Sequence, residues 1–168
     1  MAERKLLAWG KDFVIRDDAG RDCYRVDGRV LSFGDKLSLQ TMDGQEVAFV
    51  AQRLLSGGWT YEIHRGGKPF AVVKEKLFTL FHFQFTVDVP ELDDYHATGD
   101  PFSHEHTFQR SAGPVAHVSK RWFTIADTYG IDVADGEDDV TILAAVAVID
   151  LCTHGHRDQQ SFMLSGTT

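Results

Sequence analysis

The sequence predicts a single, mostly β domain with one hydrophobic helix near its C-terminus. Three observations support this fold class. Short strand-like segments recur along most of the chain, separated by turns rich in glycine and aspartate. Apolar and polar residues alternate strictly from Phe81 to Val89, and a segment that is apolar except for Thr141 runs from Val140 to Ile149.

The length and composition of the chain fit one globular domain. Of its 168 residues, 43% are hydrophobic and 25% are charged, which is ordinary for a folded protein. The segment 90–101 is poor in apolar residues and would suit a domain boundary. Each half would be small to stand alone, however, and strand signals resume directly after this segment, so we expect one domain.

The first half of the chain contains six strand-like segments with turn signals between them. The segments are 13–16, 23–26, 36–40, 47–50, 59–63 and 70–73. Turns are predicted at 17–20, Asp27-Gly28, Asp43-Gly44 and Gly66-Gly67, because Asp-Gly and Gly-Gly pairs favour the backbone angles of tight hairpins.

The clearest single strand lies at 81–89. One face would carry Phe81, Phe83, Phe85, Val87 and Val89, and the other His82, Gln84, Thr86 and Asp88. A period of two is typical of a strand and excludes an amphipathic helix. We therefore predict that the face with the phenylalanines and valines is buried.

The chain also repeats itself at a shift of 68 positions. The identical pairs are Val47/Val115, Ala48/Ala116, Val50/Val118, Arg53/Arg121, Thr60/Thr128, Tyr61/Tyr129 and Ile63/Ile131, while Phe49 falls on His117. Tyr24 and Gly28 match Tyr95 and Gly99 at a slightly larger shift, and a weaker echo places Ala71, Val73 and Lys76 on Ala116, Val118 and Arg121. Such repetition indicates a sheet wound from similar meanders, an economical route to a closed barrel. Chance similarity among strands rich in valine and alanine is the alternative.

The apolar segment 140–149 follows Asp138-Asp139, which suits a helix N-cap and first turn. Its apolar residues continue around every face, so a helix here must be buried on all sides. A buried central strand is the competing interpretation, but the alanines and the length favour a helix. We expect the domain to span 1–152 and a polar, disordered tail to cover 153–168.

The order and spacing of several short motifs resemble the LURP-one-related family. These motifs are 17–20, 24–28, 44–48, 61–63, 115–122, 129–133 and Ile149-Asp150, within a resemblance that runs from about Leu7 to Leu151. That family is similar in fold to the tubby C-terminal domain and to phospholipid scramblases. The resemblance implies a closed antiparallel β-barrel of about twelve strands around a central hydrophobic helix.

The resemblance also suggests lipid binding, because tubby domains bind phosphoinositide head groups and scramblases act on phospholipids. The basic lipid-binding residues of tubby do not align with particular positions here. The chain also departs from scramblases, because it lacks a tail long enough to span a bilayer. A fold hosts many functions, so the function must be argued from a site.

The charge of the chain limits its partners. The formal net charge is −8, from 25 acidic and 17 basic residues. This balance argues against general affinity for nucleic acid, and against adsorption to an anionic membrane unless basic residues cluster locally. Two cysteines, Cys23 and Cys152, make a disulfide framework unlikely, and the N-terminus lacks a secretory signal. We therefore expect a reduced, cytoplasmic protein without a transmembrane segment.

Basic residues do cluster locally. Lys74 and Lys76 form one pair, Lys120 and Arg121 occupy the equivalent place in the weak repeat, and Arg53 corresponds to Arg121. Brought together, these side chains would form a site for a phosphate or another anion. The alternative is that they are solvated strand ends that guard sheet edges.

Two histidines are the weaker candidates for a site. In a strand, His104 and His106 would point to the same side and could ligate a metal together with a third residue. A glutamate soon after the second histidine, as in cupin-like barrels, is missing. We therefore predict no metal and no other cofactor, and His154 and His156 would bind metal only adventitiously.

No catalytic motif is recognisable. The sequence lacks a Gly-x-Ser-x-Gly elbow and a phosphate-binding Gly-Lys-Ser/Thr ending, and its acidic runs miss the EF-hand spacing. The leading hypothesis is a non-catalytic domain that binds a phospholipid head group or a similar anionic amphiphile. A structural or protein-interaction domain is the alternative, and a metal-dependent barrel enzyme built on His104 and His106 is the third.

Overall fold

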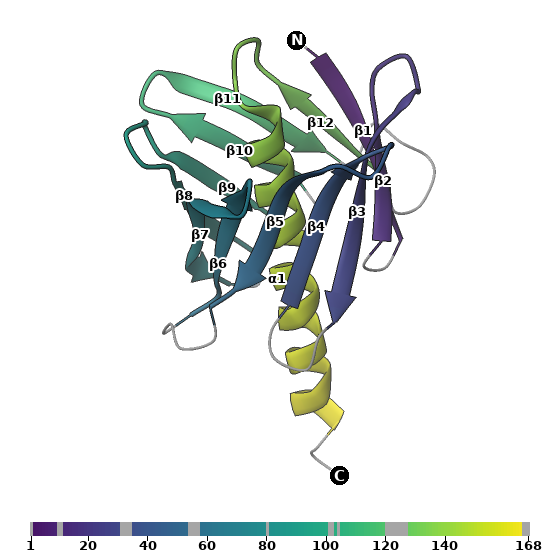
Figure 1. The fold of residues 1–168 in the computed structure, drawn as a ribbon. Coiled ribbons are helices and arrows are strands. Elements are labelled where there is room, and N and C mark those ends of the chain that lie inside the picture. Colours follow the sequence, from purple (N-terminus) through teal and green to yellow (C-terminus); the bar gives the residue numbers. More distant parts are fainter. Residues whose placement is uncertain are drawn as a thin grey trace.

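The computed structural model has an antiparallel sheet and one long helix (Figure 1). It describes residues 2–9, 12–30, 35–53, 58–79, 81–100, 103, 105–119 and 128–165. The strands are β1 (Ala2–Trp9), β2 (Asp12–Arg16), β3 (Asp22–Val30), β4 (Asp35–Thr41), β5 (Glu46–Gln52), β6 (Thr60–Arg65), β7 (Lys68–Phe78), β8 (Phe83–Asp88), β9 (Tyr95–Asp100), β10 (Glu105–Arg110), β11 (Gly113–Ser119) and β12 (Thr128–Val133). The helix is α1 (Asp139–Ser165).

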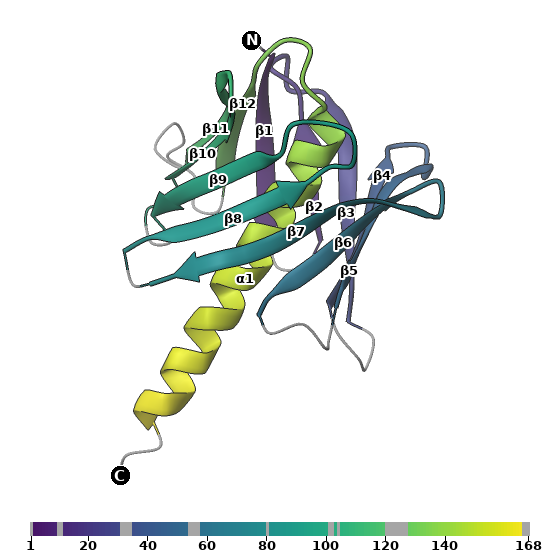
Figure 2. The same ribbon diagram turned by 90° about the vertical axis from the view of Figure 1, so that its left-hand side faces the viewer.

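The sheet wraps around α1, which runs through its centre and leaves it at one end (Figures 1 and 2). Each strand from β2 to β11 pairs antiparallel with the strands before and after it in the chain, and β1 pairs with both β2 and β12. The predicted class, a mostly β domain with one C-terminal helix against an antiparallel sheet, is confirmed.

The alternation predicted for 81–89 is confirmed except at its first residue. Phe83, Phe85, Val87 and Val89 are at most 3% exposed. Phe81 is 72% exposed, so its predicted burial is wrong. The reason is that β8 begins only at Phe83, and Phe81 lies in the turn before it, where strand alternation does not apply.

One of the predicted turns is also wrong. Asp27-Gly28 lies inside β3, where Gly28 pairs with Leu37 of β4. Gly44 and Gly67 do lie in hairpin turns with positive φ, as the sequence predicted. The strand register outweighed the turn preference of Asp-Gly, because the apolar neighbour Val26 is buried in the core.

Residues that repeat in the sequence also occupy equivalent positions in the pairing of strands. Val50 pairs with Ile63 between β5 and β6, and Val118 pairs with Ile131 between β11 and β12. Both pairs are related by the shift of 68 residues, and all four side chains are at most 1% exposed. The repeated residues therefore build the same structural unit twice.

The helix fills the core as predicted, but it ends later than predicted. Residues from Thr141 to Ile149 are all buried, at 4% exposure or less. Helical structure then continues past Cys152 to Ser165, so the expectation of a disordered tail from 153 is wrong up to that residue. The helix continues because Cys152 and Thr153 still face the core and the following residues contact β7.

Candidate functional site

The connections between elements give the molecule two chemically different ends. Six connections lie at the end where α1 begins: 17–21, 42–45, 66–67, 89–94, 111–112 and 134–138. They hold nine carboxylates, which are Asp17, Asp18, Asp43, Glu91, Asp93, Asp94, Asp135, Glu137 and Asp138, and one basic residue, Arg21. We call this the acidic end, and the opposite end, from which α1 projects, the exit end (Figure 2).

At the exit end, His156 of α1 is held between two aromatic residues and a carboxylate. Its ring stacks on Phe78 with centroids 3.8 Å apart, and the Trp59 ring lies 5.5 Å away. His156 Nε2 is 2.9 Å from Glu75 Oε1 of β7. The side chains of His156 and Glu75 are only 20% and 10% exposed. These contacts fix the helix where it leaves the sheet.

The helix also approaches Trp59 closely at Gly155. A Cβ atom at this position would lie 2.6 Å from the tip of the Trp59 ring, so the packing requires glycine. His154, on the other side of Gly155, is exposed and lies 3.6 Å from Asp150 one turn earlier. His154 and His156 therefore have different partners and do not share a site.

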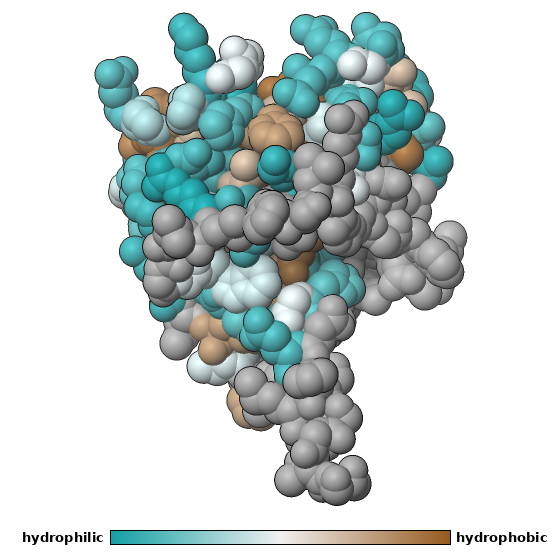
Figure 3. Space-filling model, turned by 60° about the horizontal axis from the view of Figure 1, so that its bottom comes forward, coloured by the Kyte–Doolittle hydropathy of each residue, from teal (hydrophilic) through white to brown (hydrophobic). Residues whose placement is uncertain are grey.

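The turn between β7 and β8 presents an apolar side chain at the exit end. The Thr79 hydroxyl accepts hydrogen bonds from the backbone N–H groups of Phe81 and His82, at 3.4 and 3.0 Å. The Thr79 N–H donates in turn to the His82 carbonyl at 2.7 Å. Phe81 is thus held outward by an ordered turn. Figure 3 brings this end forward and shows apolar side chains among polar ones near the projecting helix.

Lys76 is an exposed cation on the same hairpin as Phe81. It lies at a register shift between Glu75 and Leu77, where β7 has one residue more than β8. Two residues earlier in the same strand, the ammonium of Lys74 lies 3.4 Å from Asp88. Of this predicted pair, Lys74 is therefore balanced by a carboxylate.

The other predicted basic residues are less informative. Arg53 follows β5, and its half-exposed guanidinium forms an ion pair with Glu62 of β6. Its backbone N–H donates to the Thr60 carbonyl, and Thr60 pairs on its other side with Lys74. Arg53 and Lys74 are thus two strands apart, about 10 Å. Lys120 and Arg121 lie outside the described residues.

Of the predicted histidine pair, the structure describes only His106. His104 lies outside the described residues. His106 is 7% exposed, and its ring makes an edge contact with Phe83, with centroids 5.2 Å apart. The neighbouring strand β9 approaches His106 closely at Gly99. A Cβ atom added at Gly99 would lie 2.9 Å from the His106 Cβ. Across the described parts of the chain, no three His, Cys, Asp or Glu side chains are grouped to hold a metal.

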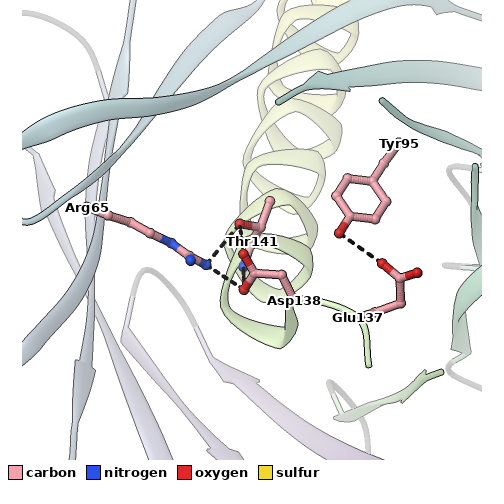
Figure 4. Close-up of polar contacts among 5 residues, drawn as sticks. All are labelled: Arg65, Tyr95, Glu137, Asp138 and Thr141. Atoms are coloured by element: carbon pink, nitrogen blue, oxygen red, sulfur yellow. Dashed lines mark hydrogen bonds and ion pairs between the residues drawn. The ribbon is translucent and has the colours of Figure 1, made fainter. Parts of the chain in front are cut away.

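At the acidic end, Arg65 holds the start of α1 (Figure 4). One of its terminal nitrogens donates to Asp138 Oδ1 at 2.6 Å and to the Thr141 hydroxyl at 2.9 Å. Asp138 caps the helix by accepting from the Thr141 backbone N–H and hydroxyl. Burial raises the pKa of Asp138, but the bonds from Arg65 and Thr141 outweigh it and bring the pKa below its usual 3.8.

A second arginine holds the residue before the cap. Arg110 lies over the Tyr95 ring, 4.1 Å from its centroid, and its Nε is 3.4 Å from Glu137 Oε2. The Tyr95 hydroxyl donates to the same oxygen at 3.1 Å (Figure 4). Burial and this hydrogen bond raise the pKa of Tyr95 above its usual 10. The charges at the helix start are therefore used in structural contacts.

Sequence reasoning missed both arginines, although a signal existed. The weak echo that aligns Ala71 and Val73 with Ala116 and Val118 also places Arg65 on Arg110. Arg65 is the last residue of β6 and Arg110 the last of β10, so each ends a strand just before a hairpin. Extending the echo upstream would have found them.

The helix itself passes a composition test for membrane spans. The window Asp139–His156 is long and apolar enough, but 61% of it is buried inside the sheet. The core helix of a domain of this kind satisfies the same test, so the finding is weak evidence for a span.

Comparisons with known proteins agree with the fold. The chain is 28% identical over 162 residues to the uncharacterised protein YxjI of Bacillus subtilis. The alignment covers 95% of this chain and 96% of the relative. The X-ray structure of an Arabidopsis thaliana protein superposes with a TM-score of 0.67 at 16% identity, over 91% of each chain. The family model described as LURP-one-related matches residues 1–150. The chain therefore belongs to the LURP-one-related family.

Proposed function

We propose that this protein is a non-catalytic domain, a closed β-barrel around α1, that binds a phospholipid head group or a similar anionic amphiphile at its exit end. The observation that carries the proposal is the β7–β8 hairpin. It places an exposed cation, Lys76, and a largely exposed apolar ring, Phe81, at the same end of the domain. An amphiphile with an anionic head and an apolar tail requires both kinds of contact.

Electrostatics favours the exit end over the acidic end. The nine carboxylates of the acidic-end connections would repel an anion, and the arginines nearby are already paired with Asp138 and Glu137. At the exit end, Lys76 is exposed and the guanidinium of Arg53 remains half exposed beside Glu62. A head group would bind Lys76 directly and would compete with Glu62 for Arg53.

The residues that most nearly resemble a catalytic group lie on the outer surface. Their setting there supports the non-catalytic part of the proposal. The Thr107 hydroxyl lies 3.2 Å from His117 Nδ1, and Glu105 lies 3.8 Å from His117 Nε2. This cluster lies on strands β10 and β11, with the His117 side chain 41% exposed. Active sites are usually enclosed recesses, and a cluster on the outer side of two strands with a 41% exposed histidine differs from that arrangement.

The test is a titration with monomeric dihexanoyl phosphatidylserine, followed by NMR chemical-shift changes in the full chain. Lys76→Glu should weaken binding by roughly tenfold, because one favourable charge contact becomes a repulsion. Lys68→Glu is the matched control, since Lys68 is an exposed lysine on the same strand at the acidic end. Equal binding by both variants would remove the site from the exit end and favour the protein-interaction alternative.

A further inference from the structure

We propose that the exit end binds its anionic ligand more tightly as the pH falls, because His64 and His156 neutralise two carboxylates that lie beside its cations. The inference rests on the proposed function and deepens it, because it names how the same site is regulated. It follows from a pattern in the described residues. The carboxylate paired with Arg53 and the carboxylate that directly precedes Lys76 both contact a histidine.

The first of these carboxylates, Glu62 of β6, is shared between a cation and a histidine. Its Oε1 forms the ion pair with the Arg53 guanidinium, and its Oε2 lies 3.3 Å from His64 Nε2. The Glu62 and His64 side chains are mostly buried, whereas the guanidinium is half exposed. A proton on His64 would convert its contact into a second ion pair, which competes with Arg53 for the same carboxylate.

The strands on either side of His64 place uncharged residues opposite it. On β5 its partner is Phe49, and the two rings make an edge contact with centroids 6.1 Å apart. On β7 its partner is Pro69. The charge of His64 therefore acts on Glu62 and, through Glu62, on Arg53.

The second carboxylate, Glu75 of β7, has the same arrangement beside the other cation. Its Oε1 lies 2.9 Å from His156 Nε2, and the rings of Phe78 and Trp59 pack against the imidazole. Lys76 is the next residue, at the register shift of the strand. Because the Glu75 side chain is nearly buried, water screens its charge poorly when His156 is neutral.

The two histidine–carboxylate pairs lie on neighbouring strands at the same end of the domain. The Arg53 N–H donates to the Thr60 carbonyl, and the Glu75 N–H donates to the Trp59 carbonyl. The segment 59–60 thus lies between the end of β5 and β7, and the backbones at Arg53 and Glu75 are about 10 Å apart across it. An anion bound between the two cations would be repelled by both carboxylates.

The direction of the pH effect follows from these charges. When the imidazoles are neutral, the carboxylates keep their full negative charge, hold Arg53 and oppose an incoming anion. Imidazole side chains take up a proton between about pH 8 and about pH 5. Each imidazolium then compensates the carboxylate that it contacts. The anion loses two repulsions and competes more easily for Arg53, so its affinity rises as the pH falls.

The experiment measures the affinity of the full chain for monomeric dihexanoyl phosphatidylserine at about pH 8 and about pH 5.5, followed by NMR chemical shifts. This probe carries the same net charge at both values. Wild type should bind about tenfold more tightly at the lower pH. Glu62→Gln combined with Glu75→Gln removes both charges and keeps the shape of the side chains. This double variant should bind at the higher pH as tightly as wild type does at the lower pH.

Two further variants control for folding and for the general charge of the chain. Glu105→Gln is the matched control, since Glu105 also contacts a histidine, His117, but lies on β10, three strands beyond β7. It should keep the full pH difference, because about 14 Å exceeds the screening length. His64→Gln leaves the packing around Glu75 intact. It should reduce the pH difference to about threefold without changing the affinity at the higher pH.

The outcomes separate this inference from the proposed function. Equal affinity of the wild-type chain at both pH values would overturn the regulation and leave head-group binding intact. A pH difference that the double variant and His64→Gln both retain, or that Glu105→Gln abolishes, would overturn the role of His64 and His156. Absence of binding to wild type at either pH would overturn both proposals.

Discussion

The acidic end and the exit end hold the same helix by different chemistry. At the acidic end, Arg65 binds Asp138 at 2.6 Å and Arg110 lies 3.4 Å from Glu137. At the exit end, an aromatic pair and a carboxylate enclose His156, while Phe81 and Lys76 remain exposed nearby. The difference teaches that a high density of charged residues at one end of a domain does not by itself mark a binding site. Here the charges nearest the start of α1 are used to hold the helix in place.

The physical reason lies in the two termini of a helix. The start of α1 carries a partial positive charge and unpaired N–H groups, which Asp138 satisfies as N-cap. That carboxylate is half buried and needs a partner, which Arg65 supplies. The helix end, in contrast, lies beyond the sheet and leaves the exit end free of this requirement.

The largest effect should come from breaking the contact at the acidic end. Asp138→Ala should lower the free energy of unfolding by about 2 kcal/mol, because it removes the N-cap and leaves Arg65 without its carboxylate. Urea denaturation measures the change. Asp18→Ala, an exposed carboxylate at the same end, should change stability by less than about 0.5 kcal/mol. Equal effects of the two substitutions would contradict the structural role of Asp138.

The same contact predicts a pH dependence. The folded pKa of Asp138 is lowered, so its stabilisation is present above the unfolded value of 3.8 and is lost as the pH falls through the lower folded value. Wild type should therefore lose stability below about pH 4 more steeply than Asp138→Asn. Parallel curves for the two proteins would show that Asp138 is not responsible.

The sequence could not predict this contact, although it predicted the cap itself. Asp138 before an apolar segment indicated a helix start, and the start was found there. Arg65 lies 73 residues earlier in the chain, and the distance between these residues is set by the strand register. Local patterns record which residues favour a cap but not which strand end will reach it.

A smaller effect is expected at the exit end. His156→Ala should destabilise the fold by about 1 kcal/mol, because the stacking on Phe78 is lost and the nearly buried Glu75 loses its partner. His154→Ala, two residues earlier and 59% exposed, is the control and should be close to neutral. Thermal unfolding of both variants decides the question. A larger loss for His154→Ala would show that the helix is held differently.

The exit end also shows where pattern reasoning fails. The alternation of 81–89 located β8 correctly, because burial follows the pleat from Phe83 onward. It wrongly placed Phe81 in the buried strand, since alternation alone does not show at which residue a strand begins. The helix end was misplaced for a related reason, because polarity after Cys152 suggested a tail while contacts of His156 with β7 extend the helix. Tertiary contacts decided both boundaries.

The central claim is that the exit end faces the ligand while the acidic end is structural. Hydrogen–deuterium exchange of the full chain, with and without phosphatidylserine-containing vesicles, tests it most directly. The account predicts slower exchange in peptides that cover 74–83 and 150–160, and no change in those that cover 89–94 and 134–138. Protection concentrated in the acidic-end peptides, or absent throughout at saturating vesicle concentration, would contradict it.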